Sequence, residues 1–552
     1  MFIKIFVLVV YALGLFAVGW WARARWSATP ENYFLANRAL GPLILLATMA
    51  ATNFSAFTVF GASGAGYRDG FAFYPIVGFG TGFMALGFWF IGRKARQLGE
   101  RYAALTPPDL VRHLYDDRMV STLFAAVLII FTIPYLALQP MAAGYALKEL
   151  LGLNHAVGAG LVTVVICSYT LRGGLRAVAW TDALQGLIMF GVLAAALILI
   201  AQEAGGLTAA GRELISKSPE LFSRPGGQGK FTPFVWFSFI FLWFFCDPMF
   251  PQLFQRFLAA RDERAIRRTM MLYPLVCSAV FLLPVTIGVL GHLQYPDLAG
   301  KAADRILPLL AADMKSEVFG SLIIACGLAA LMSTMDSQLL TLSSIFSQDM
   351  LPLAVGGSVK SAWPGRAFVV VLAGAGLAMA IHPPATILTI ARYAFTGLAV
   401  LFPTVIFGLY PGWRSSKGAL VSILTGEAAL ALDLLGYLPT GGFLAVVPIM
   451  GLSFGSYLVT AAVERSSRGL SLPLPADFLA SPFTWGFVAV FILSQDWWRW
   501  GQEPGLIWIW PAWTPYFLLL SLLQTVLMAF WSRPAERVAD SATSLAAASR
   551  SA

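Results

Sequence analysis

The chain has 552 residues, of which 58% are hydrophobic and only 12% are charged. Soluble domains carry about 25% charged residues, so this composition excludes an ordinary soluble enzyme or binding domain. The formal net charge of +9 does not indicate a nucleic-acid partner, because the basic residues lie in short segments between apolar runs. These runs recur along the chain at roughly 20 residues each, the length that crosses a bilayer, and they predict an all-α polytopic membrane protein.

Fifteen apolar segments are predicted to span the membrane. They cover residues 2–22, 40–66, 71–92, 119–147, 154–171, 178–201, 232–255, 270–292, 317–346, 367–383, 386–410, 417–436, 442–462, 480–495 and 505–531. The first segment is interpreted as a retained span and not as a cleaved signal peptide. Its apolar run ends in W20-W-A-R-A-R-W26, without a small-residue cleavage site.

Basic residues are distributed unevenly between the two sides that these spans define. When alternate loops are assigned to opposite sides, one side holds 25 of the 37 lysines and arginines and the other holds 11. Arg392 falls within a span. Cytoplasmic loops carry an excess of basic residues, so we expect a cell (inner) membrane protein with its N-terminus outside and its C-terminus in the cytoplasm.

Two predicted spans carry features that break a helix at mid-membrane depth. Residues 46–66 combine small and hydroxyl residues with Asn53 and several glycines, and in residues 237–251 Asp247 directly precedes a proline. Proline removes a backbone donor and pushes the preceding residue out of helical geometry. The two spans are five apart and cross in opposite directions, as inverted repeats of a secondary transporter require. The alternative is that glycine and proline only aid helix packing.

The stretch A329-A-L-M-S-T-M-D-S-Q-L-L340 gathers polar groups in an otherwise apolar helix. A carboxylate at bilayer depth costs at least ~2.5–3.5 kcal/mol unless it is compensated, so Asp336 indicates a functional site. Ser333 and Thr334 offer neutral oxygens that suit a sodium ion. Further neutral oxygens come from Thr48, Asn53 and Ser55 of the second span. The alternative is that each hydroxyl bonds a carbonyl of its own helix.

Four local segments of the sequence resemble the sodium:solute symporter family. They are E31-N-Y-F-L-A-N-R-A-L-G41, Y169-T-L-R-G-G-L-R-A-V-A-W-T-D-A-L-Q-G186, L331-M-S-T-M-D-S-Q-L-L340 and the segment from S416-K-G-A-L420 to Gly426. The resemblance runs from about residue 5 to residue 465. Members of the family transport proline, pantothenate, monocarboxylates, sialic acid and sugars. The resemblance implies a leucine-transporter-like fold, with two inverted five-helix repeats plus additional N- and C-terminal helices.

The same resemblance divides the chain into six parts. They are a first helix and loop (1–37), inverted repeat 1 with spans 2–6 (38–202), an external loop (203–231), inverted repeat 2 with spans 7–11 (232–411), peripheral spans 12–15 (412–532) and a cytoplasmic tail (533–552). The tail is of low complexity and is expected to be disordered.

The resemblance further implies a sodium site built from two helices. Its ligands match the carbonyls of Ala51, Phe54 and Ala330 and the hydroxyls of Ser333 and Thr334. Asp182, expected in a cytoplasmic loop, matches an aspartate implicated in sodium access and release. Asp182 and Asp336 are therefore the residues expected to act in gating or coupling.

A solute site is expected beside the sodium site. Its expected residues are Asn53, Ser55, Thr58, Gln139 (directly after Leu138), Trp243, Asp247 and Arg392. At Asn53 the chain departs from the proline transporters, which carry an aspartate there, and this argues against proline as the solute. The Arg392 guanidinium suits a carboxylate, although it could instead reach the outer membrane interface. Asp247 either neutralises Arg392 or receives a cationic part of the solute.

The leading functional hypothesis is sodium-coupled import of a small organic solute, with a carboxylate as the expected class. The chain is expected to act as a monomer in the lipid bilayer, with no nucleic-acid partner and no enzymatic activity. Its four histidines are dispersed (His113, His155, His292 and His382) and form no metal or triad spacing. The alternative is a transport-derived membrane sensor that acts with a separate signalling partner.

The orientation can be tested with fusion reporters. A reporter placed after Ala552 should be cytoplasmic, and one placed within residues 203–231 should be external, because an odd number of predicted spans lies between these two positions. Alkaline phosphatase and fluorescent-protein fusions measure the two locations. Both reporters on the same side of the membrane would contradict the predicted topology.

Overall fold

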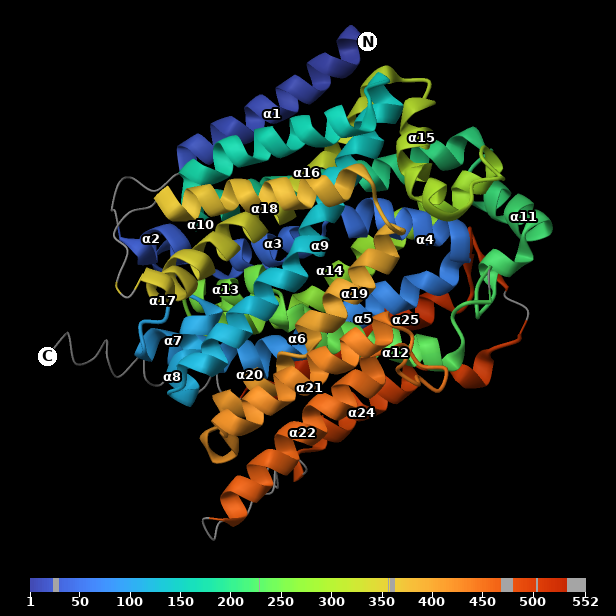
Figure 1. Ribbon diagram of the computed structural model, residues 1–552. Helices are drawn as coiled ribbons and strands as arrows, with labels where there is room; N and C mark the ends of the chain where they lie inside the picture. Colours follow the sequence, from blue (N-terminus) through green and yellow to red (C-terminus); the bar gives the residue numbers. More distant parts are fainter. Residues whose placement is uncertain are drawn as a thin grey trace, which may run out of the picture.

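A bundle of α-helices makes up most of the chain, as the composition predicts (Figure 1). The structure is a computed structural model that describes residues 1–22, 29–227, 229–355, 357, 363–467, 480–502 and 505–533. The predicted C-terminal tail from residue 534 onward lies outside the described residues. The sheet in the described part of the chain consists of two short antiparallel strands, β1 (Leu506–Ile507) and β2 (Trp510–Pro511).

Ten helices among the described residues are long and apolar enough to cross a membrane, or eleven if one bent pair counts as a single span. Each of the fifteen predicted spans contains a helix, but several of these helices are interrupted or short. Residues 57–101 count as one helical segment of 45 residues, although Gly70 (φ 74°, ψ −159°) ends α4 between the two spans predicted there, and Pro42–Asn53 and His155–Thr170 are short apolar helices. Pro482–Leu493 has only 12 residues. The number of full-length spans is therefore lower than predicted.

The first part of the chain runs from the N-terminal helix to a long bent helix. Its elements are α1 (Phe2–Ala22), α2 (Pro30–Leu35), α3 (Pro42–Asn53), η2 (Phe57–Gly61), α4 (Ala62–Asp69), α5 (Phe73–Phe83), α6 (Ala85–Gly87), η4 (Phe88–Gly92), α7 (Arg93–Arg101), α8 (Pro107–Tyr115), α9 (Arg118–Leu151) and α10 (His155–Glu203). Within α10, Gly174 adopts φ 65° and ψ 175°, a conformation that glycine reaches without steric cost. This residue divides α10 into two segments.

The second part of the chain begins outside the bundle. Its elements are α11 (Leu207–Lys217), η5 (Pro219–Phe222), α12 (Pro233–Cys246), η6 (Asp247–Met249), α13 (Pro251–Ala259), α14 (Glu263–Leu290), η8 (Gly300–Arg305), α15 (Ile306–Ala312), α16 (Glu317–Ile345), η9 (Phe346–Met350), α17 (Leu351–Val355), α18 (Trp363–Ile381), α19 (Ile387–Ala399) and α20 (Phe402–Leu409). The axes of Pro233–Met249 and Pro251–Ala259 meet at 53°. Pro248 and Pro251 lie at this bend, where each removes a backbone donor.

Close helix packing in the centre depends on glycine. The helices α4 and α14 approach so closely that a Cβ atom at Gly288 would lie 2.0 Å from the Ser63 carbonyl oxygen. A Cβ atom at Gly66 would lie 2.4 Å from the Val285 carbonyl oxygen. Small residues at such crossings allow the backbones of membrane helices to touch. The glycines of residues 61–66 therefore fix the position of α4, which follows the first helix break.

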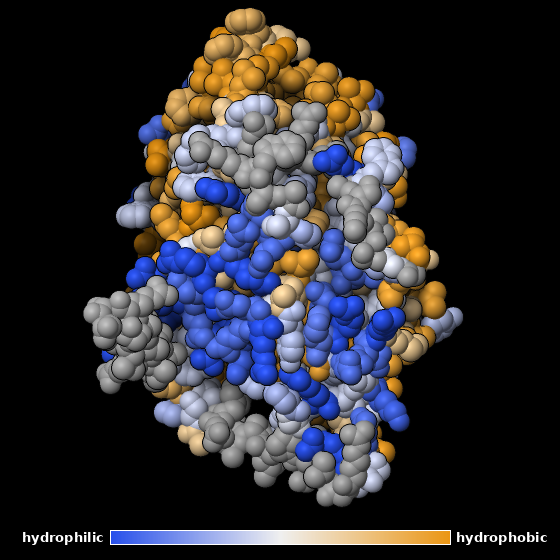
Figure 2. All heavy atoms as spheres, turned by 90° about the vertical axis from the view of Figure 1, so that its left-hand side faces the viewer, coloured by the Kyte–Doolittle hydropathy of each residue, from blue (hydrophilic) through white to orange (hydrophobic). Residues whose placement is uncertain are grey.

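Polar side chains gather at one end of the bundle. This end carries α2, α7, α8 and α17, and Figure 2 shows hydrophilic side chains over the middle of its surface. Hydrophobic side chains lie at its upper edge, where α1 runs, and α1 exposes Phe2 and Leu13 by 81% and 62%. A polar end and apolar flanks are the distribution expected of a protein that spans a bilayer along this axis.

The C-terminal helices pack on the outside of the bundle. They are α21 (Ser416–Leu434), α22 (Val446–Ser466), α24 (Pro482–Leu493) and α25 (Thr514–Trp531). Gln524 of α25 donates a hydrogen bond from Nε2 to the Gly82 carbonyl of α5 at 3.0 Å. A buried ion pair joins Arg224, after η5, to Asp496, after α24. The last helices are thus fastened both to the bundle and to the segment that precedes α12.

Candidate functional site

The break after α3 frees backbone groups in the middle of the molecule. Phe54 leaves helical geometry with φ −82° and ψ 87°. The Ala56 N–H donates to Oε1 of Gln139 on α9, and the Phe57 N–H donates to Oγ of Ser55, each at 3.1 Å. In a continuous helix these donors would serve the carbonyls four residues earlier. Those carbonyls are therefore free for other partners.

Two hydroxyl groups of α16 lie against carbonyls at the end of α3, and one of these is the freed carbonyl of Thr52. Ser333 Oγ lies 2.9 Å from the carbonyl oxygen of Ala51 and 2.9 Å from that of Ala330. Thr334 Oγ1 lies 2.9 Å from the carbonyl oxygen of Thr52 and 3.2 Å from that of Ala330. Four of the five residues predicted to bind sodium thus meet at the point where α16 passes the break.

Carbonyl oxygen atoms outnumber hydroxyl donors in this cluster. Ser333 and Thr334 contribute two hydroxyl protons, which are shared among three carbonyl oxygens. A cation with hard oxygen ligands satisfies such an excess of lone pairs. In the described part of the chain, the Thr334 hydroxyl bonds to the Thr52 carbonyl and not to that of Phe54, the fifth predicted ligand.

Asp182 lies in a buried ionic cluster beside these oxygens. Its Oδ2 accepts hydrogen bonds from Thr48 at 2.5 Å, from Thr52 at 3.0 Å and from Arg256 at 2.9 Å. The side chains of Asp182 and Arg256 are both fully buried. Asp182 was predicted in a cytoplasmic loop, but it lies within helix α10, because the helix resumes directly after the kink at Gly174.

Arg256 holds four helices together through its guanidinium group. Nε donates to Thr48 of α3, Nη1 to the Gln252 carbonyl of α13, and Nη2 to both Asp182 of α10 and Ser337 of α16, at 2.8–2.9 Å. The planar fork of arginine suits such divergent acceptors. Sequence reasoning missed Arg256, because it directly follows the predicted end of span 7 and was counted with the loop residues. Its one signal was its place at the end of the broken span.

Asp336 is buried next to this cluster and is compensated mainly by neutral groups. Its Oδ2 accepts a hydrogen bond from the Tyr169 hydroxyl at 3.2 Å, and its Oδ1 accepts one from Ser337 at 3.3 Å. Ser337 also contacts Arg256. The single guanidinium group of Arg256 thus lies near two buried carboxyl groups, Asp182 and Asp336. The local electrostatic potential therefore favours binding of an additional cation.

The predicted solute residues Asn53 and Asp247 meet where the two broken helices face each other. Asn53 Nδ2 lies 3.4 Å from Asp247 Oδ2 and 2.8 Å from the hydroxyl of Tyr273 on α14. The Cys246 thiol donates to Asp247 Oδ1 at 3.1 Å. Sequence reasoning did not identify Tyr273, because a tyrosine in an apolar span carries no local signal of function.

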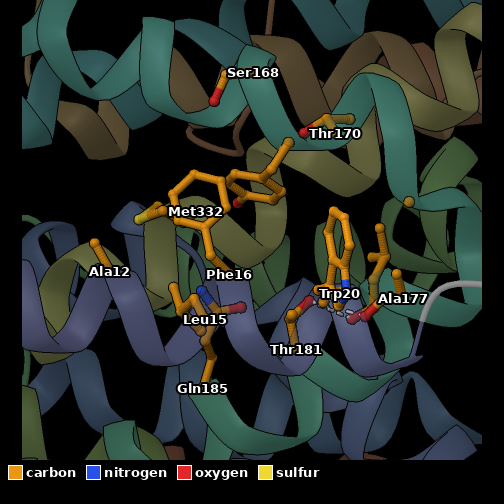
Figure 3. A pocket seen from close by; sticks show the side chains of 14 residues that line it. Ala12, Leu15, Phe16, Trp20, Ser168, Thr170, Ala177, Thr181, Gln185 and Met332 are labelled. Atoms are coloured by element: carbon orange, nitrogen blue, oxygen red, sulfur yellow. Dashed lines mark hydrogen bonds between the residues drawn. The ribbon is translucent and has the colours of Figure 1, made fainter.

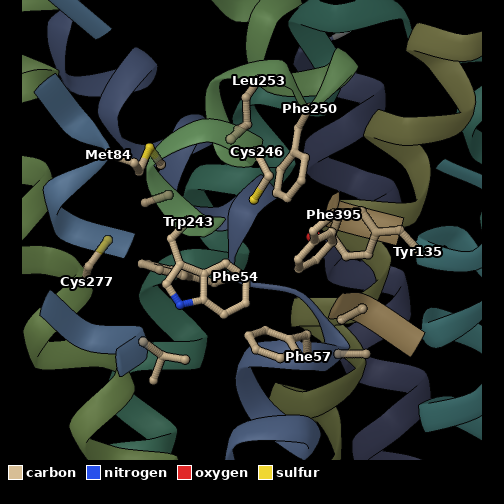
Figure 4. Packing of buried hydrophobic residues seen from close by; sticks show 14 of the residues in the cluster. Phe54, Phe57, Met84, Tyr135, Trp243, Cys246, Phe250, Leu253, Cys277 and Phe395 are labelled. Carbon is tan, nitrogen blue, oxygen red and sulfur yellow. The ribbon is translucent and has the colours of Figure 1, made fainter. Parts of the chain in front are cut away.

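Aromatic rings surround this meeting point, and Figure 4 shows them from close by. They come from four parts of the chain: Phe54 and Phe57 after α3, Tyr135 on α9, Trp243 and Phe250 on either side of the second break, and Phe395 on α19. The ring centroids of Trp243 and Phe395 are 5.6 Å apart, and those of Tyr135 and Phe395 are 4.8 Å apart. The centre of the site is therefore lined mainly by aromatic side chains.

The other predicted solute residues have different surroundings. The side chains of Gln139 and Ser55 accept hydrogen bonds from backbone N–H groups at the first break. Thr58 Oγ1 and Trp243 Nε1 are buried without a hydrogen-bond partner in the described part of the chain. Arg392 is half-buried, with its guanidinium carbon 4.7 Å from the ring centroid of Tyr393. Its expected pairing with Asp247 is not present among the described residues.

A second ionic contact closes the opposite side of the site. Asp304 of η8 accepts a hydrogen bond from Arg68 of α4 at 2.7 Å and another from the backbone N–H of Ile387 at the start of α19, at 2.9 Å. Burial raises the pKa of Asp304 above its ordinary value, while the Arg68 guanidinium opposes this shift. The aromatic centre thus lies between one ionic contact at Asp304 and another at Arg256.

A cavity of about 120 Å³ lies apart from the aromatic centre, between α1, α10 and α16 (Figure 3). Apolar side chains such as Leu15, Phe16 and Met332 form most of its wall, and Thr181 and Gln185 add polar groups. None of the predicted sodium or solute residues lines it. The chemistry expected of a transport site is therefore concentrated at the two helix breaks.

Comparisons of sequence identify relatives along most of the chain. The model of the sodium:solute symporter family matches residues 33–426. The sodium/pantothenate symporter of Escherichia coli (strain K12) is 28% identical over 469 residues, which cover 82% of this chain and 94% of the relative. The sodium/proline symporter of the same strain is 27% identical over 470 residues, which cover 81% of this chain and 90% of the relative.

Comparisons of structure support the same fold. A Na⁺-coupled sialic acid symporter aligns with a TM-score of 0.69 at 19% identity, covering 84% of this chain and 98% of that symporter. A transporter of the nucleobase-cation-symport-1 family aligns with a TM-score of 0.56 at 15% identity, covering 81% and 98%. The helices therefore adopt the leucine-transporter-like fold that the sequence predicts.

The contacts of Arg256 predict how its replacement changes the free energy of unfolding. Arg256→Ala should lower the free energy of unfolding by about 3–5 kcal/mol, because it leaves the Asp182 carboxyl group buried without its partner. Arg256→Ala combined with Asp182→Ala should lose less than the sum of the two single changes. Thermal unfolding of the purified variants measures these differences.

The variant Arg256→Lys tests the positive charge of Arg256 separately from the geometry of its guanidinium group. It keeps the positive charge but cannot reach four acceptors, so uptake should fall, and the melting temperature should fall less than in Arg256→Ala because Asp182 keeps a positively charged partner. Arg261→Ala is the matched control, because this side chain is 57% exposed. Additive effects of Arg256→Ala and Asp182→Ala would show that the two residues do not act as a pair.

Proposed function

Because the chain belongs to the sodium:solute symporter family and uses sodium as its coupling ion, we propose that it imports a small organic solute together with sodium by alternating access, acting as a monomer. The observation that carries this proposal is the contact of Ser333 and Thr334 with the carbonyls of the broken helix α3. The relatives that match along most of their length are symporters, which favours transport over catalysis and gives the sensor alternative no support.

The proposed sodium ligands come from α3 and α16. Ser333 Oγ lies 2.9 Å from the carbonyl oxygens of Ala51 and Ala330, and Thr334 Oγ1 lies 3.2 Å from that of Ala330. The Phe54 carbonyl is proposed as the fifth ligand, because Phe54 leaves helical geometry at the break. Sodium replaces the two hydroxyl protons as the partner of the carbonyl oxygens, so the hydroxyl groups turn their lone pairs toward the ion.

Alternating access is proposed to act through the two ionic contacts. Opening toward the Asp304 side separates Asp304 from Arg68 and from the start of α19, and opening toward the other side separates Arg256 from its acceptors. The end with α7 carries many basic residues and is proposed to face the cytoplasm. The division into inverted repeats at residues 38–202 and 232–411 is part of this proposal.

The solute is proposed to carry a carboxylate group. Pantothenate and proline, which the names of two relatives contain, are both carboxylates. Arg392 is the proposed contact for this group, because it lies one helical turn before Phe395, a ring of the aromatic centre. A guanidinium group binds a carboxylate through two parallel hydrogen bonds.

The sodium assignment predicts a change in sodium dependence. Ser333→Ala combined with Thr334→Ala should raise the sodium concentration for half-maximal uptake by about fivefold or more, since two ligands at about 0.5–1.5 kcal/mol each are lost. Uptake of a labelled solute into proteoliposomes measures this concentration. Sodium should tighten solute binding by the same factor by which the solute tightens sodium binding, because coupling between sites is reciprocal.

Ser347→Ala provides the matched control for this variant. The Ser347 hydroxyl bonds the Ser343 carbonyl of its own helix at 2.7 Å, so its removal deletes a hydroxyl without touching the proposed ligands. If the double variant kept the sodium dependence of the parent, the ligand assignment would be wrong.

The carboxylate assignment predicts a selective loss of solute affinity. Arg392→Lys keeps the charge but removes the planar pair of donors, so the KM for the solute should rise while the sodium dependence stays the same. Arg212→Lys on the exposed face of α11 is the control. A variant with an unchanged KM would place Arg392 outside the site, as a residue that reaches the membrane interface.

A further inference from the structure

Asp247 is a buried carboxyl group that lacks a positively charged partner. Its side chain is nearly inaccessible, with a relative exposure of 2%. Its contacts are the Asn53 amide at 3.4 Å and the Cys246 thiol at 3.1 Å, which are both neutral. Among the described residues, no lysine, arginine or histidine forms an ion pair with it.

Three other buried aspartates of this protein are compensated by an arginine, whereas Asp336 accepts hydrogen bonds from the neutral groups of Tyr169 and Ser337. Asp182 pairs with Arg256, Asp304 pairs with Arg68 and Asp496 pairs with Arg224. An uncompensated carboxylate at this depth is costly and marks a functional site by default. Asp247 has no such partner among the described residues, so its carboxyl group is open to a cation from outside the protein.

Aromatic residues lie close to Asp247 along the chain, on either side of the second break. Trp243 lies one helical turn earlier, so it shares a face of the helix with Asp247, and its carbonyl accepts the Asp247 N–H. Phe250 follows directly after the break, with its ring centroid 4.8 Å from that of Phe395 and 5.2 Å from that of Tyr135. The faces of aromatic rings carry negative charge and attract cations, most of all organic ammonium groups.

The hard oxygen ligands that sodium prefers are gathered elsewhere. They lie between α3 and α16, where Ser333 and Thr334 meet the backbone carbonyls. Asp247 has an amide nitrogen and a thiol for neighbours, and these are poor partners for sodium. The surroundings of Asp247 thus favour an organic cation over a second sodium ion.

We propose that Asp247 binds a positively charged nitrogen of the transported solute, an ammonium or quaternary ammonium group, against the rings of Trp243, Phe250, Phe395 and Tyr135. The inference rests on the proposed function and names the solute class more closely. The Trp243 indole N–H and the Thr58 hydroxyl, which are buried without partners among the described residues, donate to the oxygen atoms of the same solute. The favoured solute is therefore a small zwitterion, with its carboxylate group on the side of Arg392.

A thermal-shift experiment on the purified full chain tests this inference. The probes are glycine betaine, proline and choline, which carry a cationic nitrogen, and pantothenate, acetate and glucose, which do not. Each probe is measured in sodium chloride and in potassium chloride. At least one cationic probe should raise the melting temperature in sodium chloride, because ligand binding stabilises the folded state by mass action. The three other probes should have no effect.

Two variants show whether Asp247 supplies this preference. Asp247→Asn should weaken binding of the active probe by at least about tenfold, while Asp247→Glu should retain much of it, because only the first change removes the charge-assisted contact. Asp297→Asn in the exposed external loop is the matched control and should bind like the parent. A retained rise in melting temperature with sodium alone shows that Asp247→Asn is folded.

Several outcomes would overturn the inference. Stabilisation only by probes without a cationic nitrogen, no stabilisation by any cationic probe, or equal binding of the active probe by Asp247→Asn would each do so. A change in sodium affinity of Asp247→Asn in the absence of any probe would identify the bound cation as sodium instead. If a cationic probe acted equally in sodium and potassium chloride, the Asp247 contact would stand and sodium coupling would fail.

Discussion

Unpaired backbone carbonyls in the middle of a membrane are the constraint on which this structure depends. Where α3 ends at Asn53, the next amides turn to the side chains of Gln139 and Ser55, and the carbonyls they leave behind need partners that water cannot supply. Thr334 provides a hydroxyl group for the Thr52 carbonyl, and Ser333 provides one for the neighbouring carbonyl of Ala51. An arrangement with more lone pairs than protons is stable in the closed protein and is also suited to a cation.

The second break also leaves backbone groups without helical partners, but the side chains beside it are of a different kind. Pro248 and Pro251 remove two backbone donors at the bend of α12 and α13, and Asp247 brings a carboxyl group to the same place. The two halves of the site thus differ in kind. Neutral, hard oxygen atoms gather at the first break, and a carboxyl group with aromatic rings gathers at the second.

Much of this arrangement could be predicted from the sequence. Long apolar runs predicted the helical class, and small residues, prolines and polar groups within two spans predicted where helices break, since each of these signals acts locally. The Ser333–Thr334 pair stood out because hydroxyl groups adjacent to a carboxylate are rare in lipid. The contact of these hydroxyls with α3 required the resemblance to a family, because helix spacing alone does not say which helices meet.

The residues that escaped prediction act through contacts that are distant in the chain. Arg256 joins positions 208 and 81 residues away, and Tyr273 meets Asn53 across 220 residues. No local pattern distinguishes such an arginine from one in a loop. The number of full-length spans was overestimated for a related reason, since a hydrophobic run does not reveal whether its helix is bent or shortened by its neighbours.

Coupling between sodium and solute follows from the composition of α3. One turn and a half of this helix touches all three parts of the site: Thr48 contacts the Arg256 cluster, the Ala51 and Thr52 carbonyls meet the proposed sodium ligands, and Asn53 contacts Asp247. A shift of α3 cannot improve one of these contacts without altering the others, because the helix is stiff over this distance. At the proposed sites, binding of either solute or sodium would bias the same element, and this shared element is the physical basis on which reciprocal coupling can arise.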